Sequence, residues 1–122
     1  MAARSLLVKV TCDLTAAERL NQALTVPATA AASGVPVSVW LSGEATVLAV
    51  PGAAEELPTL PHAVPMADLR DTLLDLATVT VCAQCAKRRD LREADLLPGA
   101  RIAGAAAFVE EALGDGVQAL VY

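Results

Sequence analysis

The chain has 122 residues, 55% of them hydrophobic, and its mean hydropathy of +0.50 makes it more apolar than most soluble domains. A net charge of −5 and three aromatic residues (one Trp, one Tyr, one Phe) argue against nucleic-acid binding, which uses basic faces and stacking rings. The length predicts one domain over residues 1–122 with a core of its own, and no window is apolar enough to cross a membrane.

The start of the chain predicts a strand followed by a helix. Residues 6–10 form an apolar run broken by one lysine, which is typical of a short strand. Thr15 and Glu18 have the spacing of a capping box at the start of a helix, and helical periodicity continues to Ser33. We expect Pro27, inside this segment, to kink the helix or split it.

The middle of the chain predicts a second strand, a loop and a second helix. Residues 35–41 alternate apolar and polar side chains with the period of a strand. A short helical piece is expected over residues 44–50, and the loop 51–65, which holds four prolines, has room for a helical turn at 53–57. Residues 66–77 place leucines on one side and charges on the other, as in an amphipathic helix.

The last third predicts three more strands and two more helices. A β-branched run at 78–82 is typical of a buried strand, and good helix formers follow it over residues 83–91. A strand over 100–103, a helix over 105–113 and a strand over 117–122 complete the chain.

This alternation predicts an α/β fold, a three-layer flavodoxin-like sandwich with a mainly parallel sheet of about five strands. In such a sheet the loops after the strands open on one edge, where ligands bind. If the first strand lay beside the third, Cys12 would approach Cys82. The residues expected at this edge are Cys12, Asp13, Ser42, Gly43, Glu44, Cys82, Cys85 and Gly104.

The strongest chemical signal is the pair Cys82 and Cys85 at the junction between the third strand and its helix. A helix start offers free N–H groups and the positive end of the peptide dipoles, and both favour a thiolate. Arg88 and Arg89 follow Cys85 by three and four residues, share its helix face and add positive charge. We therefore expect Cys82 and Cys85 to be the reactive groups, with Arg88 and Arg89 stabilising charge and Cys12, Asp13 and Glu44 as accessory residues.

Each of these features also has a structural explanation. Two cysteines at a helix start can be small buried apolar residues, and a basic cluster can be a solvated helix face. Loop carboxylates such as Asp13 and Glu44 are usually solvated.

Three functional classes compete with a thiol-transfer protein. A Cys-x-x-Cys at a strand-to-helix junction is also the signature of a thiol-disulfide redox protein. Cys12, Cys82, Cys85 and His62 offer four possible metal ligands, but their spacing is unlike that of structural zinc sites, so we expect no metal. A non-catalytic assembly subunit is the third class.

Cysteine usage and surface composition bear on compartment and assembly. Three cysteines without a repeating spacing argue against a disulfide framework, and charges interrupt any secretory leader, so a cytoplasmic location is expected. The surplus of apolar residues predicts an oligomer. No Gly-x-Gly-x-x-Gly or P-loop follows a predicted strand, and we expect no cofactor.

With these elements in order, the chain resembles the DsrE/DsrF-like sulfur-relay family, which includes the Tus-type carriers. The likeness is carried by Val81-Cys82-x-x-Cys85-Ala86-x-Arg88-Arg89, by Leu97-Pro98-Gly99-Ala100, and by Glu18-Arg19 and Val37-Ser38-Val39-Trp40-Leu41-Ser42-Gly43 earlier in the chain. It covers nearly the whole sequence. Many relatives have Gly after the arginine, where this chain has Asp90.

The resemblance implies a parallel α/β subunit that assembles as a homotrimer or homohexamer, or with related chains. It implies a cysteine after the third strand, here Cys82, that accepts sulfur as a persulfide from a donor protein and passes it to an acceptor, as a sulfurtransferase-like carrier does. Cys85 matches a second thiol found in some members. Other members lack the cysteine and serve as structural partners.

Overall fold

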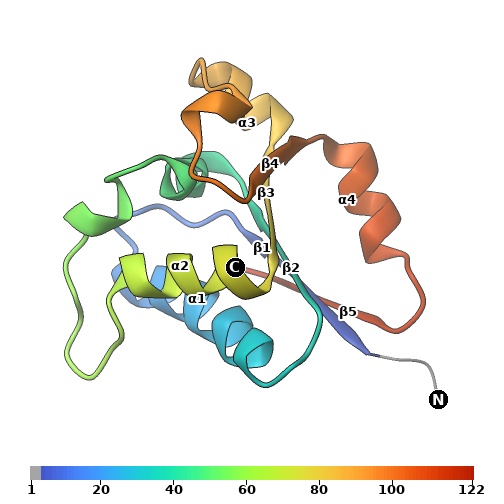
Figure 1. Cartoon of the computed structure of the whole chain (residues 1–122), viewed down its shortest axis with the longest axis horizontal. Coiled ribbons are helices and arrows are strands. Elements are labelled where there is room, and N and C mark those ends of the chain that lie inside the picture. The colour runs from blue at the N-terminus through green and yellow to red at the C-terminus, as the bar shows by residue number, and fades with distance from the viewer. Residues whose placement is uncertain (1–3) are drawn as a thin grey trace.

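The computed structural model describes residues 4–122, and its centre is a five-stranded sheet in the order β4-β3-β2-β1-β5 (Figure 1). All four neighbouring pairs are parallel, so the predicted parallel α/β fold is confirmed. The strands are β1 (Ser5–Val10), β2 (Val37–Leu41), β3 (Thr78–Cys82), β4 (Ala100–Ala103) and β5 (Val117–Val121).

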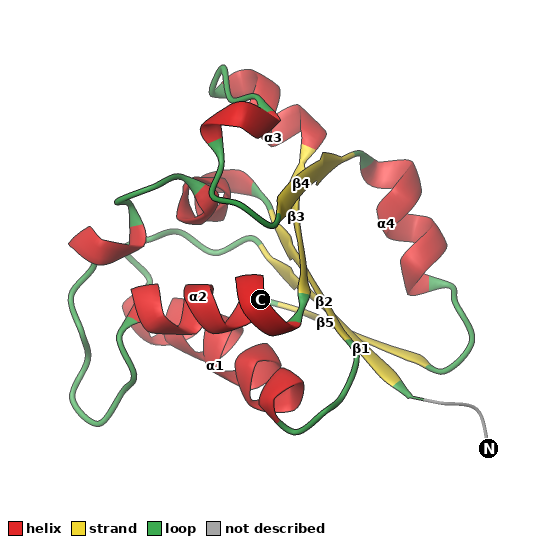
Figure 2. Ribbon diagram, viewed as in Figure 1, coloured by secondary structure: helices red, strands yellow, loops and turns green. Residues whose placement is uncertain are grey.

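The helices form layers on both faces of the sheet (Figure 2). Helices α1 (Ala17–Ala32) and α2 (Met66–Leu76) cover one face, α4 (Ala105–Ala112) covers the other, and α3 (Ala83–Arg88) projects from the carboxyl edge. The chain steps from β1 to β4 in one direction and returns through α4 to β5. Because parallel crossovers are right-handed, this reversal places α4 on the opposite face. Three 3₁₀ turns, η1 (Gly43–Ala49), η2 (Ala54–Glu56) and η3 (Glu93–Asp95), complete the chain.

The main core lies between the sheet and the α1–α2 layer. Alternate residues of the three central strands point into it, because side chains of a strand alternate between its two faces. Burying each such aliphatic side chain is worth about 1.5–3 kcal/mol. The core side chains on this side include Val8, Val10, Val39, Leu41, Val79, Val81, Leu20, Leu24, Leu69 and Leu73.

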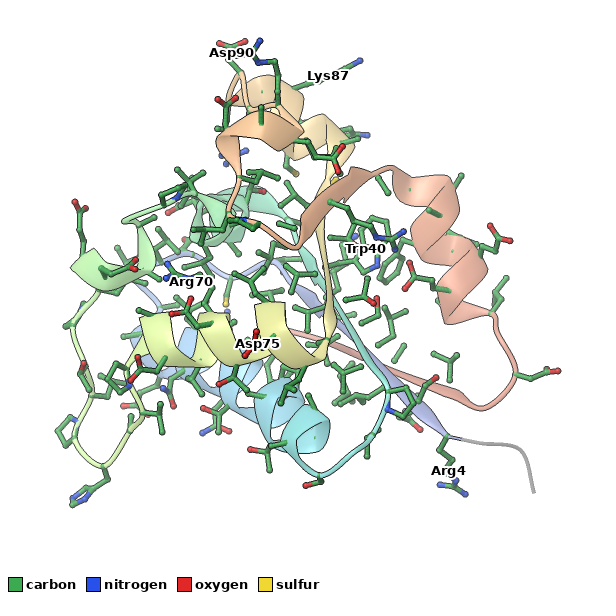
Figure 3. All side chains as sticks on the ribbon, viewed as in Figure 1. Arg4, Trp40, Arg70, Asp75, Lys87 and Asp90 are labelled. Carbon is green, nitrogen blue, oxygen red and sulfur yellow. The ribbon has the colours of Figure 1, made fainter. Side chains whose placement is uncertain are left out.

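Polar and aromatic contacts hold α4 to the other face. Glu111 accepts hydrogen bonds from Ser38 Oγ (2.6 Å), Trp40 Nε1 (3.2 Å) and Arg101 Nη2 (3.1 Å). Trp40, which lies between the sheet and α4 in Figure 3, meets Phe108 edge to face at 5.4 Å. No residue of α4 is fully buried.

Two details of α1 differ from the sequence prediction. The predicted capping box of Thr15 and Glu18 is wrong: the helix starts at Ala17, and its N-cap residue Ala16 makes no side-chain capping bond. A turn in which Ala16 N–H donates to the Asp13 carbonyl leads into the helix instead. Pro27 does not split the helix, because its ring is buried in the packed layer, and this packing offsets the missing backbone hydrogen bond.

The strand order also differs from the simplest expectation. The first strand is not beside the third, because β2 lies between them. Helix α3 ends at Arg88 rather than near residue 91, and the turn η3 was not predicted. Across residues 4–122, no helix has both the length and the apolar character needed to cross a bilayer.

Candidate functional site

Cys82 lies where β3 becomes α3. It is the last residue of the strand and the N-cap residue of the helix, with an extended backbone (φ −61°, ψ 126°). The β-branched residues before it favour the strand, whereas Ala83 and the residues after it favour the helix. This placement aims the first N–H groups of α3 toward the Cys82 side chain.

The pKa of the Cys82 thiol is below its ordinary value, although partial burial alone would raise it. Four groups outweigh the burial: the backbone N–H and the thiol of Cys85, the backbone N–H of Gln84, and the hydroxyl of Ser42. Each of these groups favours the charged form of the sulfur. Cys82 is half-buried and keeps an opening to solvent, so its sulfur is accessible to reagents.

Cys85 is the buried member of the pair, with 7% of its surface exposed. Its Sγ accepts a hydrogen bond from the backbone N–H of Gly43 at 3.2 Å. Gly43 is the first residue of η1 and adopts a left-handed conformation (φ +56°) that glycine tolerates best. The turn after β2 therefore contacts the first turn of α3 at this sulfur.

The two arginines at the end of α3, Arg88 and the C-cap residue Arg89, have their own partners. Arg89 Nη1 donates to the Cys85 carbonyl at 3.1 Å, and Arg88 Nη2 donates to the Gln84 side chain at 3.1 Å. Lys87 and Asp90 lie at the outer end of the lobe that projects from the carboxyl edge, which consists of α3 and the residues up to η3 (Figure 3). Charge stabilisation by Arg88 and Arg89 stays a prediction.

Asp90 ends α3 in a left-handed conformation (φ +52°). The Asp90 N–H donates to the Lys87 carbonyl and the Leu91 N–H to the Ala86 carbonyl, which is the Schellman pattern. Asp90 thus adopts the conformation that Gly favours at this position, and α3 stops after six residues.

The predicted accessory residues lie at the same edge but in different surroundings. Cys12 is buried in the core cluster, and burial raises the pKa of its thiol. Asp13 and Glu44 are exposed. His62 is exposed in the loop before α2, and within residues 4–122 no group of three or more His, Cys, Asp or Glu side chains is placed to hold a metal ion.

Two residues that lie at the thiols, Ser42 and Gly43, were not predicted from the sequence to be site residues. Ser42 and Gly43 were expected at the carboxyl edge, but nothing in the sequence paired the Ser42 hydroxyl with Cys82 or the Gly43 N–H with Cys85. The signal that would have found them is strand order. In the observed register Leu41 pairs with Val81, so Ser42 follows beside Cys82.

Comparisons with known proteins agree with this architecture. The model of the DsrE/DsrF-like family matches residues 7–121. No curated protein sequence matches the chain. Two similar solved structures are the ychN protein from E. coli (TM-score 0.78, 14% identity, 98% of this chain and 99% of that one) and MTH1491, a protein of unknown function from Methanobacterium thermoautotrophicum (TM-score 0.65, 13% identity, 99% and 100%). At these identities the two structures support the fold, whereas the family match spans nearly the whole sequence, and the chain belongs to the DsrE/DsrF-like family.

Proposed function

We propose that this protein carries sulfur as a persulfide on Cys82 and passes it from a donor protein to an acceptor protein. The observation that supports this best is the environment of Cys82, whose pKa is lowered by four surrounding donors in spite of burial. The general role of the DsrE/DsrF-like family in sulfur relay supports the same assignment.

In the loading step, the Cys82 thiolate attacks the outer sulfur of a donor persulfide. The donor's sulfur–sulfur bond breaks, its cysteine leaves as a thiolate with the electron pair, and a new sulfur–sulfur bond forms on Cys82. In the unloading step, an acceptor thiolate attacks the outer sulfur of the Cys82 persulfide, and Cys82 leaves as the thiolate. No net oxidation or reduction occurs, and the donors around Cys82 stabilise the negative sulfur at each stage.

We assign Cys85 to a resolving role. Its thiol is one of the groups that lower the pKa of Cys82, and this proximity supports an attack by Cys85 on the inner sulfur of a Cys82 persulfide. That attack would form a Cys82–Cys85 disulfide and release hydrosulfide, and a thiol reductant would then restore both cysteines. In the structure all three cysteines are free.

Arg88 and Arg89 are proposed to raise the positive potential around the loaded sulfur, with Lys87 and Arg92 in the same lobe. Asp13 and Glu44, exposed at the same edge, are proposed to orient the partner protein. An accessory role for Cys12 is still only a prediction, since burial raises the pKa of its thiol.

A thiol-disulfide redox protein is the second candidate. A partly exposed cysteine of lowered pKa beside a buried one is also the arrangement that such proteins use. The reduction potential of the Cys82–Cys85 pair separates the two. A pair that cycles readily with glutathione-like buffers favours the redox protein, whereas the transfer of sulfur through Cys82 does not require the disulfide.

Treatment with inorganic polysulfide, followed by mass measurement of the intact protein, tests the carrier. The wild type should gain about 32 Da, one sulfur atom. Cys85→Ser should also gain this mass and keep it longer, because resolution is lost. Cys12→Ser is the matched control and should behave as the wild type. If Cys82→Ser gains sulfur as fast as the wild type, Cys82 is not the carrier.

A further inference from the structure

The Ser42 hydroxyl is a buried polar group without a full hydrogen bond. Ser42 is 6% exposed, and among residues 4–122 its Oγ has no hydrogen-bond partner. Its backbone is fully used, because Ser42 N–H donates to the Val10 carbonyl (2.9 Å) and its carbonyl accepts from Ala45 (3.1 Å). An unpaired buried hydroxyl is destabilising, so its presence calls for an explanation.

The hydroxyl lies at the thiol site. The pairing of Leu41 with Val81 places the next residues, Ser42 and Cys82, side by side. The Ser42 hydroxyl is also one of the groups that lower the pKa of Cys82. The next residue, Gly43, donates its N–H to Cys85. Two consecutive residues after β2 thus lie at the two sulfurs, Ser42 beside Cys82 and Gly43 beside Cys85.

We propose that Ser42 is a positioning residue whose hydroxyl donates to the negatively charged Cys82 sulfur, both as thiolate and as persulfide. A neutral thiol is a weak hydrogen-bond acceptor, so the hydroxyl makes no strong bond to it. An anionic sulfur is a strong acceptor. The unpaired state of Ser42 is therefore the resting condition of a donor that completes its bond when Cys82 ionises. The role in the persulfide rests on the proposed function, but the role in the thiolate does not.

Thr46 provides a matched control in the neighbouring turn η1. Its hydroxyl is also fully buried and unpaired among the described residues. It is not one of the four groups that lower the pKa of Cys82. Removing either hydroxyl should leave the fold as stable as before or more stable, because an unsatisfied group is lost.

Charged side chains around the sulfur keep their contacts in these variants. Arg88 of α3 donates to Gln84, and the C-cap residue Arg89 donates to the Cys85 carbonyl. Arg101 of β4 donates to Thr80 and Glu111. Glu44 of η1 and Asp13 after β1 are exposed. A change in the titration of Cys82 can therefore be assigned to the hydroxyl.

The experiment measures the rate of Cys82 alkylation by iodoacetamide across pH, without any sulfur donor and with fragment-ion mass spectrometry to separate Cys82 from Cys85. In Ser42→Ala the pKa of Cys82 should rise, so that alkylation at a fixed pH below the pKa should slow, by a factor of about ten for each unit of rise. Ser42→Gly, which also lacks the hydroxyl, should give the same shift, and Thr46→Val should match the wild type.

Two results would overturn the inference: a Ser42→Ala profile that superimposes on the wild type, or an equal shift in Thr46→Val. Sulfur uptake from polysulfide is then measured on the same variants. If the wild type takes up no sulfur, the proposed function is wrong. If Ser42→Ala still shifts the pKa of Cys82 in that case, the role of Ser42 toward the thiolate is nevertheless supported.

Discussion

The backbone N–H of Gly43 donates to the Sγ of Cys85 at 3.2 Å, across 42 positions of sequence. This bond joins the end of β2 to the first turn of α3, and it holds Cys85 in the interior while Cys82 remains half-exposed. The different surroundings of the two thiols therefore depend on a turn that carries no cysteine. Changes to this turn should alter thiol chemistry without touching a sulfur atom.

Gly43→Ala should lower stability and loosen Cys85. A β-carbon at this position would lie 3.5 Å from the Thr11 carbonyl oxygen, an ordinary contact, so the cost comes from the left-handed backbone and should be about 1–2 kcal/mol. Gly34→Ala is the matched control, because Gly34 also has positive φ (+87°) and open space around it. Urea unfolding should show similar losses for both variants, but only Gly43→Ala should speed the alkylation of Cys85. Equal rates of Cys85 alkylation in the two variants would contradict the link between Gly43 and Cys85.

The ion pair between Glu55 and Arg70 should make stability depend on acidic pH. Arg70 is buried in α2, and its two terminal nitrogens each donate to Glu55 at 2.7 Å. The hydrogen bonds from Arg70 lower the pKa of Glu55 from 4.5 to about 2. Because the folded pKa is depressed, the stabilisation is complete above the unfolded pKa and is lost as pH falls through the folded value.

Glu55→Gln should therefore unfold at a lower temperature than the wild type at neutral pH, and the difference should shrink as pH falls from 4.5 toward 2. The neighbouring exposed carboxylate Glu56 is the control, and Glu56→Gln should melt as the wild type does. A melting difference that stays constant down to the lowest pH would argue against the ion pair. Thermal melts followed by circular dichroism measure the difference in melting temperature at each pH.

Glu111→Gln should weaken the attachment of α4. The carboxylate accepts from three side chains, and an amide has a single acceptor oxygen, so at least one donor on the sheet loses its partner. The loss should be about 1–3 kcal/mol in the free energy of unfolding. Trp40 is the only tryptophan, so its fluorescence reports the change directly. The exposed Glu110 is the control, and an equal loss in Glu110→Gln would contradict the assignment.

We propose that copies of the chain associate through the α4 face, as the homotrimer or homohexamer that the family resemblance implies. Leu113 is 79% exposed next to α4, and Val109 and Val121 on the same side are 52% and 66% exposed. Leu113→Asp should reduce the mass measured by analytical ultracentrifugation, because a charge opposes the burial of this surface. Leu76→Asp places the same charge at the exposed end of α2 and should leave the assembly intact. A wild type that sediments as a monomer would refute the proposal.

The sequence predicted the elements well, because each has a strong local signal. The alternating pattern before Ser42 and the β-branched run before Cys82 are visible without any tertiary information, and so is the strand-to-helix junction at the thiols. Parallel connectivity then predicted which loops share an edge. These features depend on short stretches of chain.

The sequence could not show contacts that depend on strand order and on tertiary packing. Nothing local places β2 between β1 and β3, so the approach of Ser42 to Cys82 was invisible. The prediction that Pro27 would split the helix was wrong, because the packing of its buried ring outweighs the low helix propensity of proline. The Arg70–Glu55 pair also joins residues fifteen positions apart through a loop whose path the sequence does not fix.

The central claim is that Cys82 carries sulfur, and peptide mass spectrometry of the protein purified without reductant tests it most directly. Fragment ions of the peptide that contains both thiols distinguish Cys82 from Cys85. We predict an added mass of about 32 Da on Cys82, removed by a thiol reductant and absent from Cys12. Unmodified Cys82, both as purified and after exposure to polysulfide, or sulfur found on Cys12 or Cys85 alone, would contradict the account.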